Sequence, residues 1–467
     1  MIDEKSYDAF ALQLFGLENI DVESIKVIRS GNDVIIDIFL VPKPIPCPYC
    51  SFDHPRVKNY VLKKITHSEL TDRGCMIHYH ARRFECPICK RTYYEQNPFV
   101  FKNMKISIKT VYNVLDALKK CNETFSSVAH MFHLSPTTVA SIFDAHVDMK
   151  RKTLPERICI DETYAFQSNS SKYICVLLDF DTQKPIDVLP SRNFDYLKSY
   201  FFKIPKKERE HVLFLCSDMY DCYRSVANAC FPNAATIVDH YHVIQDLNRH
   251  TEAVRIMVMK EKKKKDPDSY YLLKKFNWMI YRNDETEEEI ERLKEKGKLP
   301  IFDPNNERKY NKHFNQYINY YEIREKIRNI DKELTEAWNL KDDVKDFYDE
   351  ANLDNAEIKL NELITKFTSS SVAEMKDFGK TLKKWKKEII NSFHVMGYEY
   401  KVSNSTGRLA VHEKKMNNAI IENRNSIIKI LKKNANGYSN WTRFRNRTLY
   451  VLDKDSTYSM YPIKKDK

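Results

Sequence analysis

The stretch RICIDETYAF at residues 157–166 opens a series of short apolar runs that decides the fold. Branched and apolar residues dominate this stretch, so we expect a strand. The run HVLFLCSD at 211–218 is almost continuously apolar, as is typical of a buried central strand. Working outward, the sequence predicts further strands at 172–180, 184–189 and 235–239, and helices at 194–202, 221–229 and 243–258.

This order of three strands followed by alternating helices and strands predicts an RNase H-like fold. Asp161 lies on the first strand, and Asp218 ends the fourth strand, which would lie beside the first. Two carboxylates on adjacent strands can hold divalent cations about 3.5–4 Å apart, and Mg²⁺ suits such ligands. By spacing alone, however, paired strand-end aspartates are more often solvated or capping groups. Glu162 should point to the opposite face, and four acidic residues make weaker candidates: Glu162, Asp179, Asp221 and Asp239.

Four of the eleven cysteines form two knuckles of the pattern Cys-Pro-x-Cys. Two such turns can supply four thiolates to one tetrahedral ion, so we predict one structural Zn²⁺ in a β-rich module, held by Cys47, Cys50, Cys86 and Cys89. The alternative is four free thiols in turns. Rival ligands rank lower because none is paired at knuckle spacing: Cys75, His54, His67, His78 and His80.

Residues 107–147 predict a helix-turn-helix. Helical periodicity over 108–118 is followed by a short helix at 124–132, a turn, and a second helix at 136–147. Ser135 is a good N-cap and Pro136 suits the first helical position. Small polar residues at the start of the second helix would face DNA: Thr137, Thr138 and Ser141. Any three-helix bundle has a similar pattern, but the zinc module directly before it favours DNA binding.

Residues 256–400 are rich in lysine and glutamate and almost free of glycine, which predicts an all-helical insertion. An apolar stripe at steps of three and four residues is interpreted as a core face rather than a base-stacking platform: Tyr317, Tyr320, Ile323, Ile327, Ile330, Leu334 and Trp338.

The composition of the chain limits which cofactors and partners are expected. The eight glycines include no pair at the spacing of a Walker or dinucleotide-binding loop, so no nucleotide cofactor is expected. No apolar run is long enough to span a membrane, and the N-terminus lacks signal-peptide character, so we expect a cytoplasmic protein without a membrane partner. The net charge is +12, and residues 401–450 carry eleven Lys or Arg residues against two glutamates. Such clustering indicates a polyanion partner or, about equally well, a solvated helix face.

The end of the chain is the most specific part. MNNAIIENRNSIIK at 416–429, followed by KKNANGYSNWTRFRNR at 432–447, resembles the terminal signature of DDE insertion-sequence transposases, in particular the IS-L-three family. There a glutamate opens a helix that leads into a basic stretch, a Gly-Tyr turn and an aromatic-arginine segment. The paired knuckles, the helix-turn-helix, and the blocks IDET at 160–163, SDMY at 217–220 and VDHYHV at 238–243 match this family in order. The sequence departs from the family at two places. It has His240-Tyr241 where the family usually has a bulky residue followed by Phe, and it has Asn418-Ala419 where Asn-Gly is common.

The resemblance implies that Asp161, Asp218 and Glu422 form a catalytic triad binding two Mg²⁺ (or Mn²⁺) ions. It implies metal-dependent hydrolysis at a transposon end, followed by transfer of the freed 3′-hydroxyl into target DNA. The partners would be double-stranded DNA, both terminal inverted repeats and target, and a second copy of the chain in a homodimer, within the nucleoid of a bacterium. Basic residues near Glu422 would grip the DNA backbone: Arg424, Lys429, Lys432, Lys433, Arg443, Arg445 and Arg447.

We therefore expect a multidomain α+β chain. Its divisions are an N-terminal segment (1–40), the zinc-binding module (41–98), the helix-turn-helix (99–150), a catalytic domain in two parts (151–255 and 401–450), the helical insertion (256–400) and a basic tail (451–467). Two alternatives share these features. One is a catalytically silent, transposase-derived repressor, and the other is an RNase H-like nuclease or resolvase. A further possibility is that the zinc module mainly mediates dimerisation.

Overall fold

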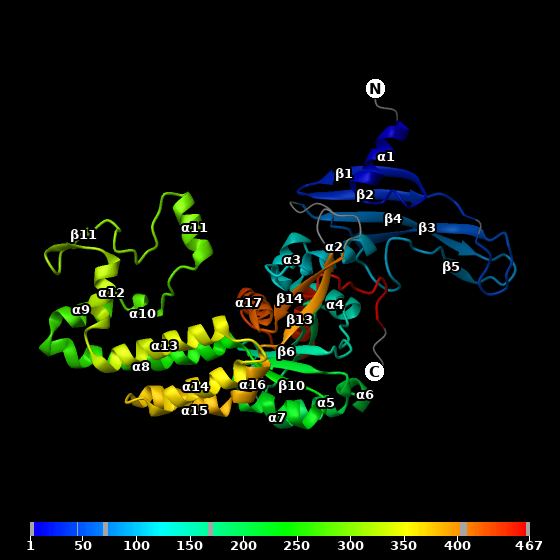
Figure 1. The fold of residues 1–467 in the computed structure, drawn as a ribbon. Coiled ribbons are helices and arrows are strands. Elements are labelled where there is room, and N and C mark those ends of the chain that lie inside the picture. Colours follow the sequence, from blue (N-terminus) through cyan, green and yellow to red (C-terminus); the bar gives the residue numbers. More distant parts are fainter. Residues whose placement is uncertain (1–3, 44, 69–72, 167–170, 402–408, 464–467) are drawn as a thin grey trace.

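The computed structural model describes residues 4–43, 45–68, 73–166, 171–401 and 409–463 (Figure 1). An N-terminal sheet module lies above a small helical bundle, and a long helical arm projects sideways from the central sheet (Figure 1). No helix in the described ranges is both long and apolar enough to cross a membrane.

The N-terminal module is a helix packed on a five-stranded sheet of order β1-β2-β4-β3, with β5 paired to β4. Its elements are α1 (Glu4–Leu14), β1 (Val22–Ser30), β2 (Asp33–Leu40), β3 (Arg56–Thr66), β4 (Cys75–Glu85) and β5 (Thr92–Tyr94). Strand β2 alternates between buried and mostly half-buried residues, and its inward Ile36 and Ile38 pack with Ile77 and Tyr79 of β4. Residues 4–40 therefore form one module with the knuckle-bearing strands, unlike the separate segment expected from the sequence.

The next 50 residues fold into the expected three helices, α2 (Ile108–Leu118), α3 (Phe125–Met131) and α4 (Pro136–His146). Ser135 caps α4 by accepting from the N–H of Thr138, and Pro136 stands at its first turn, as predicted. The chain end packs on this bundle, since Ser459 donates its N–H to the carbonyl of His146 and Lys119 Nζ donates to the carbonyl of Asp453. The segment expected to be a basic tail thus packs against the helical bundle through residue 463, although most of its residues after 453 are half-buried or exposed.

The central sheet has the order β10-β9-β6-β7-β8. Strands β6, β7 and β8 form an antiparallel meander, β9 runs parallel to β6, and β10 runs parallel to β9. Their bounds are β6 (Arg157–Thr163), β7 (Ile174–Asp179), β8 (Pro185–Leu189), β9 (Phe214–Ser217) and β10 (Ala235–Val238). The predicted order of strands and helices is confirmed.

Helices cover both faces of this sheet. Ile158 and Ile160 of β6 pack toward α5 (Phe194–Phe202) and α7 (Asp221–Cys230), next to the short α6 (Lys206–Glu210). The intervening Cys159 packs toward α17 (Ala419–Asn434) and α18 (Trp441–Leu452). Alternation along β6 therefore assigns each of its residues to one of two cores.

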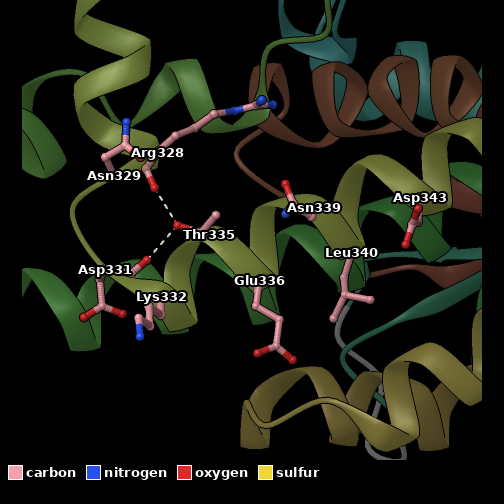
Figure 2. Close-up of a pocket in the computed structure, with 9 residues that line it drawn as sticks. All are labelled: Arg328, Asn329, Asp331, Lys332, Thr335, Glu336, Asn339, Leu340 and Asp343. Carbon is pink, nitrogen blue, oxygen red and sulfur yellow. Dashed lines mark hydrogen bonds between the residues drawn. The ribbon is translucent and has the colours of Figure 1, made fainter.

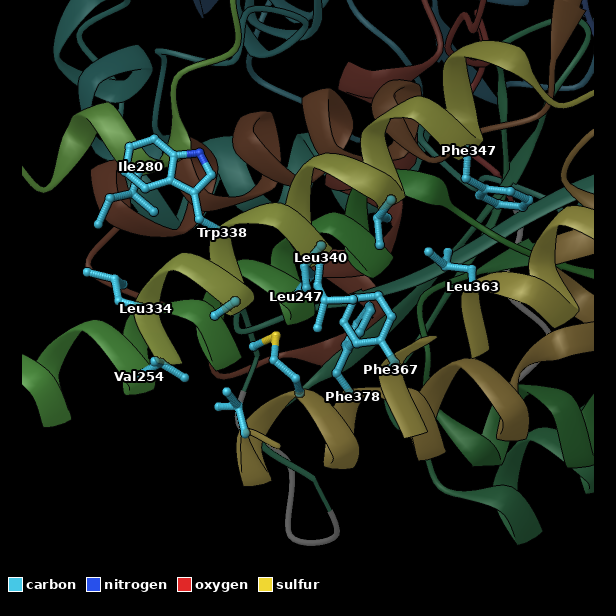
Figure 3. Close-up of a cluster of buried hydrophobic side chains, with 14 of the residues drawn as sticks. Leu247, Val254, Ile280, Leu334, Trp338, Leu340, Phe347, Leu363, Phe367 and Phe378 are labelled. Atoms are coloured by element: carbon cyan, nitrogen blue, oxygen red, sulfur yellow. The ribbon is translucent and has the colours of Figure 1, made fainter. Parts of the chain in front are cut away.

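The arm is built on α8 (His240–Lys265), which leaves the sheet directly after β10. Buried residues of α8, α13, α14 and α15 form its core, with Trp338 and Phe378 among them (Figure 3). The other elements are α9 (Pro267–Lys275), α10 (Trp278–Tyr281), α11 (Glu287–Glu295), α12 (Tyr320–Arg328), α13 (Lys332–Glu350), α14 (Ala356–Ser369), α15 (Ala373–Lys384) and α16 (Lys386–Asn391).

Two findings correct the predicted insertion. It is not all-helical, because β11 (Lys309–Asn311) and β12 (Gln316–Ile318) form an antiparallel hairpin, and β13 (Val395–Lys401) pairs with β14 (Leu409–Lys415) across its predicted end. The apolar stripe is a core face only from Ile323 onward. Tyr317 and Tyr320 lie in the hairpin and the first turn of α12, where they are exposed.

The turn between α12 and α13 borders an open pocket of about 560 Å³, shown in Figure 2. Thr335 closes this turn by donating to the carbonyls of Arg328 and Asp331. The pocket is lined only by residues 328–343 of the arm and contains none of the residues expected to be catalytic.

Candidate active site

Asp161 and Asp218 meet at one edge of the central sheet. β6 and β9 are adjacent and parallel, so the carboxyl ends of both strands lie side by side. One carboxylate oxygen from each of Asp161, Glu162 and Asp218 lies within 4.8 Å of the other two. The sequence prediction that the two aspartates come together agrees with this geometry.

Glu162, a weaker candidate by its sequence position, also lies at this edge of the sheet. Its main partners are on the α7 side of the sheet: Tyr223 donates its hydroxyl to Glu162 at 2.6 Å, and Arg192 forms an ion pair with it. Asp161 instead accepts a hydrogen bond from Asn425 of α17, on the other side, at 2.8 Å. As expected for successive strand residues, Asp161 and Glu162 bind partners on opposite faces of the sheet. Their carboxylates nevertheless approach each other at the end of the strand.

The electrostatics of this edge favour a cation. Burial raises the pKa of Asp161 to about 7, and the charges of Glu162, Asp218 and Glu422 add to the rise. Burial and the charge of Glu162 raise the pKa of Asp218 to about 6, although His242 and Arg192 counteract part of this. Among the described residues, nothing donates a hydrogen bond to the buried Oδ1 of Asp218. A buried carboxylate oxygen without a donor, beside carboxyl groups whose pKa values are raised, fits a site for a divalent cation.

Glu422 reaches the same edge from the far end of the chain. It lies in the first turn of α17, and its Oε1 is 3.8 Å from Nε2 of His242. Asn425 is three residues further along, hence on the same helix face, and it holds Asp161. Sequence reasoning missed Asn425, although its spacing from Glu422 was available as a signal.

A second cluster surrounds Glu422. Oxygens of Asp239 and Glu422 and a ring nitrogen of His242 lie within 4.8 Å of one another. Asp239 also accepts from the backbone N–H of Tyr241, at the start of α8, and of Asn418, just before α17. Burial would raise the pKa of Asp239, but His240 and these two N–H groups lower it below its usual range. Asp239 thus ties β10 to the beginning of α17 and fixes where Glu422 can reach.

The four knuckle cysteines converge on one point. Sγ of Cys47 is 3.6 Å from Sγ of Cys89, and Sγ of Cys50 is 3.5 Å from Sγ of Cys86. Four sulfurs around tetrahedral zinc at about 2.3 Å would be separated by roughly 3.8 Å, so these distances fit a zinc ion. In each knuckle the residue after the second cysteine has a positive φ and donates its N–H to the carbonyl of the first cysteine. The two turns are therefore built alike.

None of the rival ligands joins this cluster among the described residues. His67 is buried and hydrogen-bonded to Ser107 and to the carbonyl of Phe15, and burial lowers its pKa to about 4. His80 pairs with Asp37 and stacks on Phe39. Cys75 lies in the hydrophobic core of the sheet.

The expected DNA-contacting residues divide into two groups. Thr137 and Ser141 are exposed on the first turns of α4, and Thr138 is half-buried beside them. Lys429, Lys432 and Lys433 line an open pocket of about 520 Å³ at the end of α17, with Tyr164 opposite. Arg424 is partly buried and donates to the carbonyl of Gln183.

The arginines of α18 bind groups on neighbouring elements of the fold. Arg447 is only 1% exposed and donates to the carbonyls of Lys120 and Glu123, so the prediction that it contacts DNA is wrong. Arg443 binds Asp144 of α4 through both carboxylate oxygens, and Arg445 binds Asp187 of β8. All three connect α18 to neighbouring elements, and the clustering of positive charge alone did not reveal this.

Comparison with known proteins agrees with this geometry. A family model described as a transposase, of the DDE type and the ISL3 family, matches residues 158–448. This match contains both aspartates at the sheet edge and Glu422. A relative named as the transposase for insertion sequence element IS1001 of Bordetella parapertussis is 19% identical over 444 residues, which cover 94% of this chain and 95% of the relative. Because the family model covers well over half of the chain, the protein belongs to the ISL3 (IS-L-three) family of DDE transposases.

Proposed function

We propose that the protein is the transposase of an insertion sequence and that it cuts and joins DNA with Asp161, Asp218 and Glu422 as catalytic carboxylates. The observation that carries the proposal is their convergence. Two carboxylates from adjacent parallel strands lie within 4.8 Å of each other. Glu422, on a helix about 200 residues later, forms a neighbouring cluster with Asp239 and His242 and is close enough for its charge to raise the pKa of Asp161. The strand order of the central sheet supports an RNase H-like fold for this domain.

The site would take two divalent cations, Mg²⁺ or Mn²⁺. When bound, they would activate the attacking oxygen and stabilise the leaving oxygen. Asp161 and Asp218 would hold them together with Glu422. Asn425 fixes the orientation of Asp161 through a 2.8 Å hydrogen bond, and Asp239 fixes the start of α17. Arg192 and Tyr223 hold Glu162 from the other side of the sheet, so the carboxylates are positioned before DNA arrives.

DNA recognition would be divided between two surfaces. The first turns of α4, with Thr137, Thr138 and Ser141, would enter a groove of the end sequence. Arg424, Lys429, Lys432 and Lys433 of α17 would bind backbone phosphates next to the cut. The zinc-bound knuckles would stabilise the N-terminal sheet, and synapsis of two ends would require a homodimer.

The experiment is an excision and integration assay in cells. A marker is placed between the DNA segments that flank the gene, and the wild-type protein or Asp218→Asn is supplied in trans. Movement is expected with the wild type and none with the variant. In vitro, the variant should retain end binding but lose metal-dependent cleavage. If the wild-type protein binds ends without cutting them under any divalent metal, the protein acts as a DNA-binding repressor and the proposal is wrong.

A further inference from the structure

Two exposed tyrosines extend the β6–β7 ladder next to the catalytic carboxylates. Thr163 of β6 pairs with Ile174 of β7, so Tyr164 and Tyr173 form the next cross-strand pair beyond the ladder. Their ring centroids are 5.9 Å apart in an edge-to-face arrangement. Tyr164 directly follows β6 and is 48% exposed, and Tyr173 directly precedes β7 and is 38% exposed, although most residues of both strands are buried.

Cations flank this pair on both sides. Nζ of Lys432, from α17, lies 3.9 Å from the ring centre of Tyr164. The guanidinium of Arg192 lies 4.3 Å from the ring centre of Tyr173 and 4.8 Å from that of Tyr220. The resulting strip, Lys432-Tyr164-Tyr173-Arg192-Tyr220, combines two cations with three aromatic rings. We call it the aromatic strip.

The strip is joined directly to the active site. Tyr164 is three residues after Asp161. Arg192 is held by Glu162, whose carboxylate lies within 4.8 Å of those of Asp161 and Asp218. Lys432 belongs to α17, the helix that carries Glu422. A nucleotide whose phosphate lies at the carboxylates would therefore have its base within reach of the tyrosines.

The chemistry of the strip distinguishes between paired and unpaired DNA. A duplex offers phosphates and groove edges, and for these the lysines of α17 would be sufficient. Its base faces are covered by stacking, and an aromatic ring can contact them only after a base has left the stack. Exposed tyrosines interleaved with cations are the combination that binds single-stranded nucleotides, with the rings stacking on bases and the cations neutralising phosphates.

We propose that the aromatic strip binds unpaired nucleobases beside the scissile phosphate, so that the DNA end is locally opened when it is cut. This inference rests on the proposed function. It adds a feature of the substrate that the catalytic carboxylates themselves do not require. The strip would capture the extruded bases and compensate for the free energy lost in unstacking them.

The test compares two versions of the end DNA, one fully paired and one with two mismatched base pairs next to the cut. Affinities are measured by fluorescence anisotropy with Ca²⁺ in place of Mg²⁺, so that binding is read without cleavage. Because each base that stacks on a tyrosine ring favours the opened end, the wild-type protein should bind the mismatched end roughly tenfold or more tightly, which corresponds to about 1.4 kcal/mol. The double variant Tyr164→Ala/Tyr173→Ala should lose this preference.

Two further variants serve as controls. Tyr164→Phe/Tyr173→Phe keeps both rings and should keep the preference. Tyr321→Ala removes a tyrosine with the same 38% exposure as Tyr173 from α12, on the arm away from β6 (Figure 1), and should also keep it. Equal affinity of the wild type for both ends, or a preference that survives in the double alanine variant, would overturn the inference. Failure of the proposed function is separate, since it would appear as absence of cleavage of either end with Mg²⁺ or Mn²⁺.

Discussion

At the scale of single residues, the candidate active site is a cluster of like charges that the fold holds together. The effect is clear at Asp161, because burial and the charges of three neighbouring carboxylates raise its pKa to about 7. In the unfolded chain an aspartate releases its proton near pH 4. Between these two values the folded protein binds more protons than the unfolded chain, so this residue makes the metal-free protein less stable as the pH rises.

The first prediction follows from that sign. Without metal at pH 8, the melting temperature of Asp161→Asn should exceed that of the wild type by on the order of 1–3 °C. Near pH 4, the two melting temperatures should be the same. Addition of Mg²⁺ or Mn²⁺ at pH 8 should raise the melting temperature of the wild type and leave the variant unchanged. Thermal denaturation followed by circular dichroism measures both effects. Asp349→Asn, at an exposed position of α13, is the control and should show neither. A wild type that is as stable as the variant at pH 8 without metal would contradict this view of the site.

The basic residues near Glu422 differ in role, although their sequence pattern is the same. Arg445 binds the carboxylate of Asp187, which is only 3% exposed, whereas Lys433 is exposed in the pocket at the end of α17. Arg445→Ala should therefore destabilise the protein by about 2–4 kcal/mol, because it leaves a buried charge unpaired. Lys433→Ala should leave stability unchanged and reduce the slope of log affinity for DNA against log salt by about 0.9. Urea denaturation and salt-dependent DNA binding separate the two roles, and a reversed outcome would mean that the assignments are interchanged.

At the scale of elements, α17 shows how one helix assembles a site. Its first turns present Glu422 and Asn425 to the sheet edge, and its last turn presents Lys432 and Lys433 to the aromatic strip and the pocket. Asp239 anchors its beginning through the N–H of Asn418, and Ile421, Ile428 and Leu431 anchor it along its buried face. Small rotations of this helix would move the proposed catalytic and DNA-binding groups together.

The zinc module gives the element-scale prediction. Cys86 and Cys89 directly follow β4, the strand that pairs with β2, β3 and β5, so loss of the ion should loosen one end of the sheet. Cys86→Ser should lower bound zinc from about one ion per chain to none, measured by atomic emission, and should increase hydrogen exchange in β4 and β5. Cys121→Ser lies outside the cluster and should keep the ion. Retention of a full zinc equivalent in Cys86→Ser would show that the four cysteines are not its ligands.

At the scale of the whole molecule, the helical arm is joined firmly to the catalytic sheet. Glu388 of α16 is buried between Arg224 of α7 and Thr236 of β10, and Arg224 also lies 3.6 Å from the ring centre of Trp385. Val238 of β10 belongs to the same hydrophobic core as Val243 of α8 and Trp338 of α13. We therefore expect the arm and the sheet to unfold together.

The chain itself provides the two probes for this prediction. In Trp441→Phe the remaining tryptophans are all in the arm, whereas the buried Cys159, Cys175 and Cys216 are in the sheet. Fluorescence and cysteine alkylation should give the same urea midpoint. Glu388→Ala should lower both midpoints together, since it leaves Arg224 without its buried partner. Glu357→Ala removes an exposed ion pair to Lys386 and should have little effect. Two separate midpoints in the parent variant would show that the arm folds independently.

Much of this architecture could be predicted because it depends on local patterns. The strand and helix order of residues 157–258, the caps of α4 and the two knuckles follow from periodicity and turn chemistry over a few residues. The β11–β12 hairpin was missed because each of its strands has only three residues within a charged, helix-like composition. The pairing of β2 with β4 was missed because the two strands are separated by more than 30 residues, and no local pattern records a distant partner.

The sequence by itself determined the order of the strands that carry Asp161 and Asp218 and the two cysteine knuckles, because strands and knuckles have recognisable local signatures. It singled out the proposed triad, including Glu422, only through the resemblance to the family's motifs. The tertiary structure decided what these groups meet. It brought Asn425 to Asp161, His242 to Glu422 and Arg192 to Glu162, buried Arg447, and placed Lys432 above Tyr164. The physical reason is that pairing of side chains far apart in the chain depends on the register and packing of whole elements, whereas a local pattern specifies only the conformation and amphipathic face of its own element.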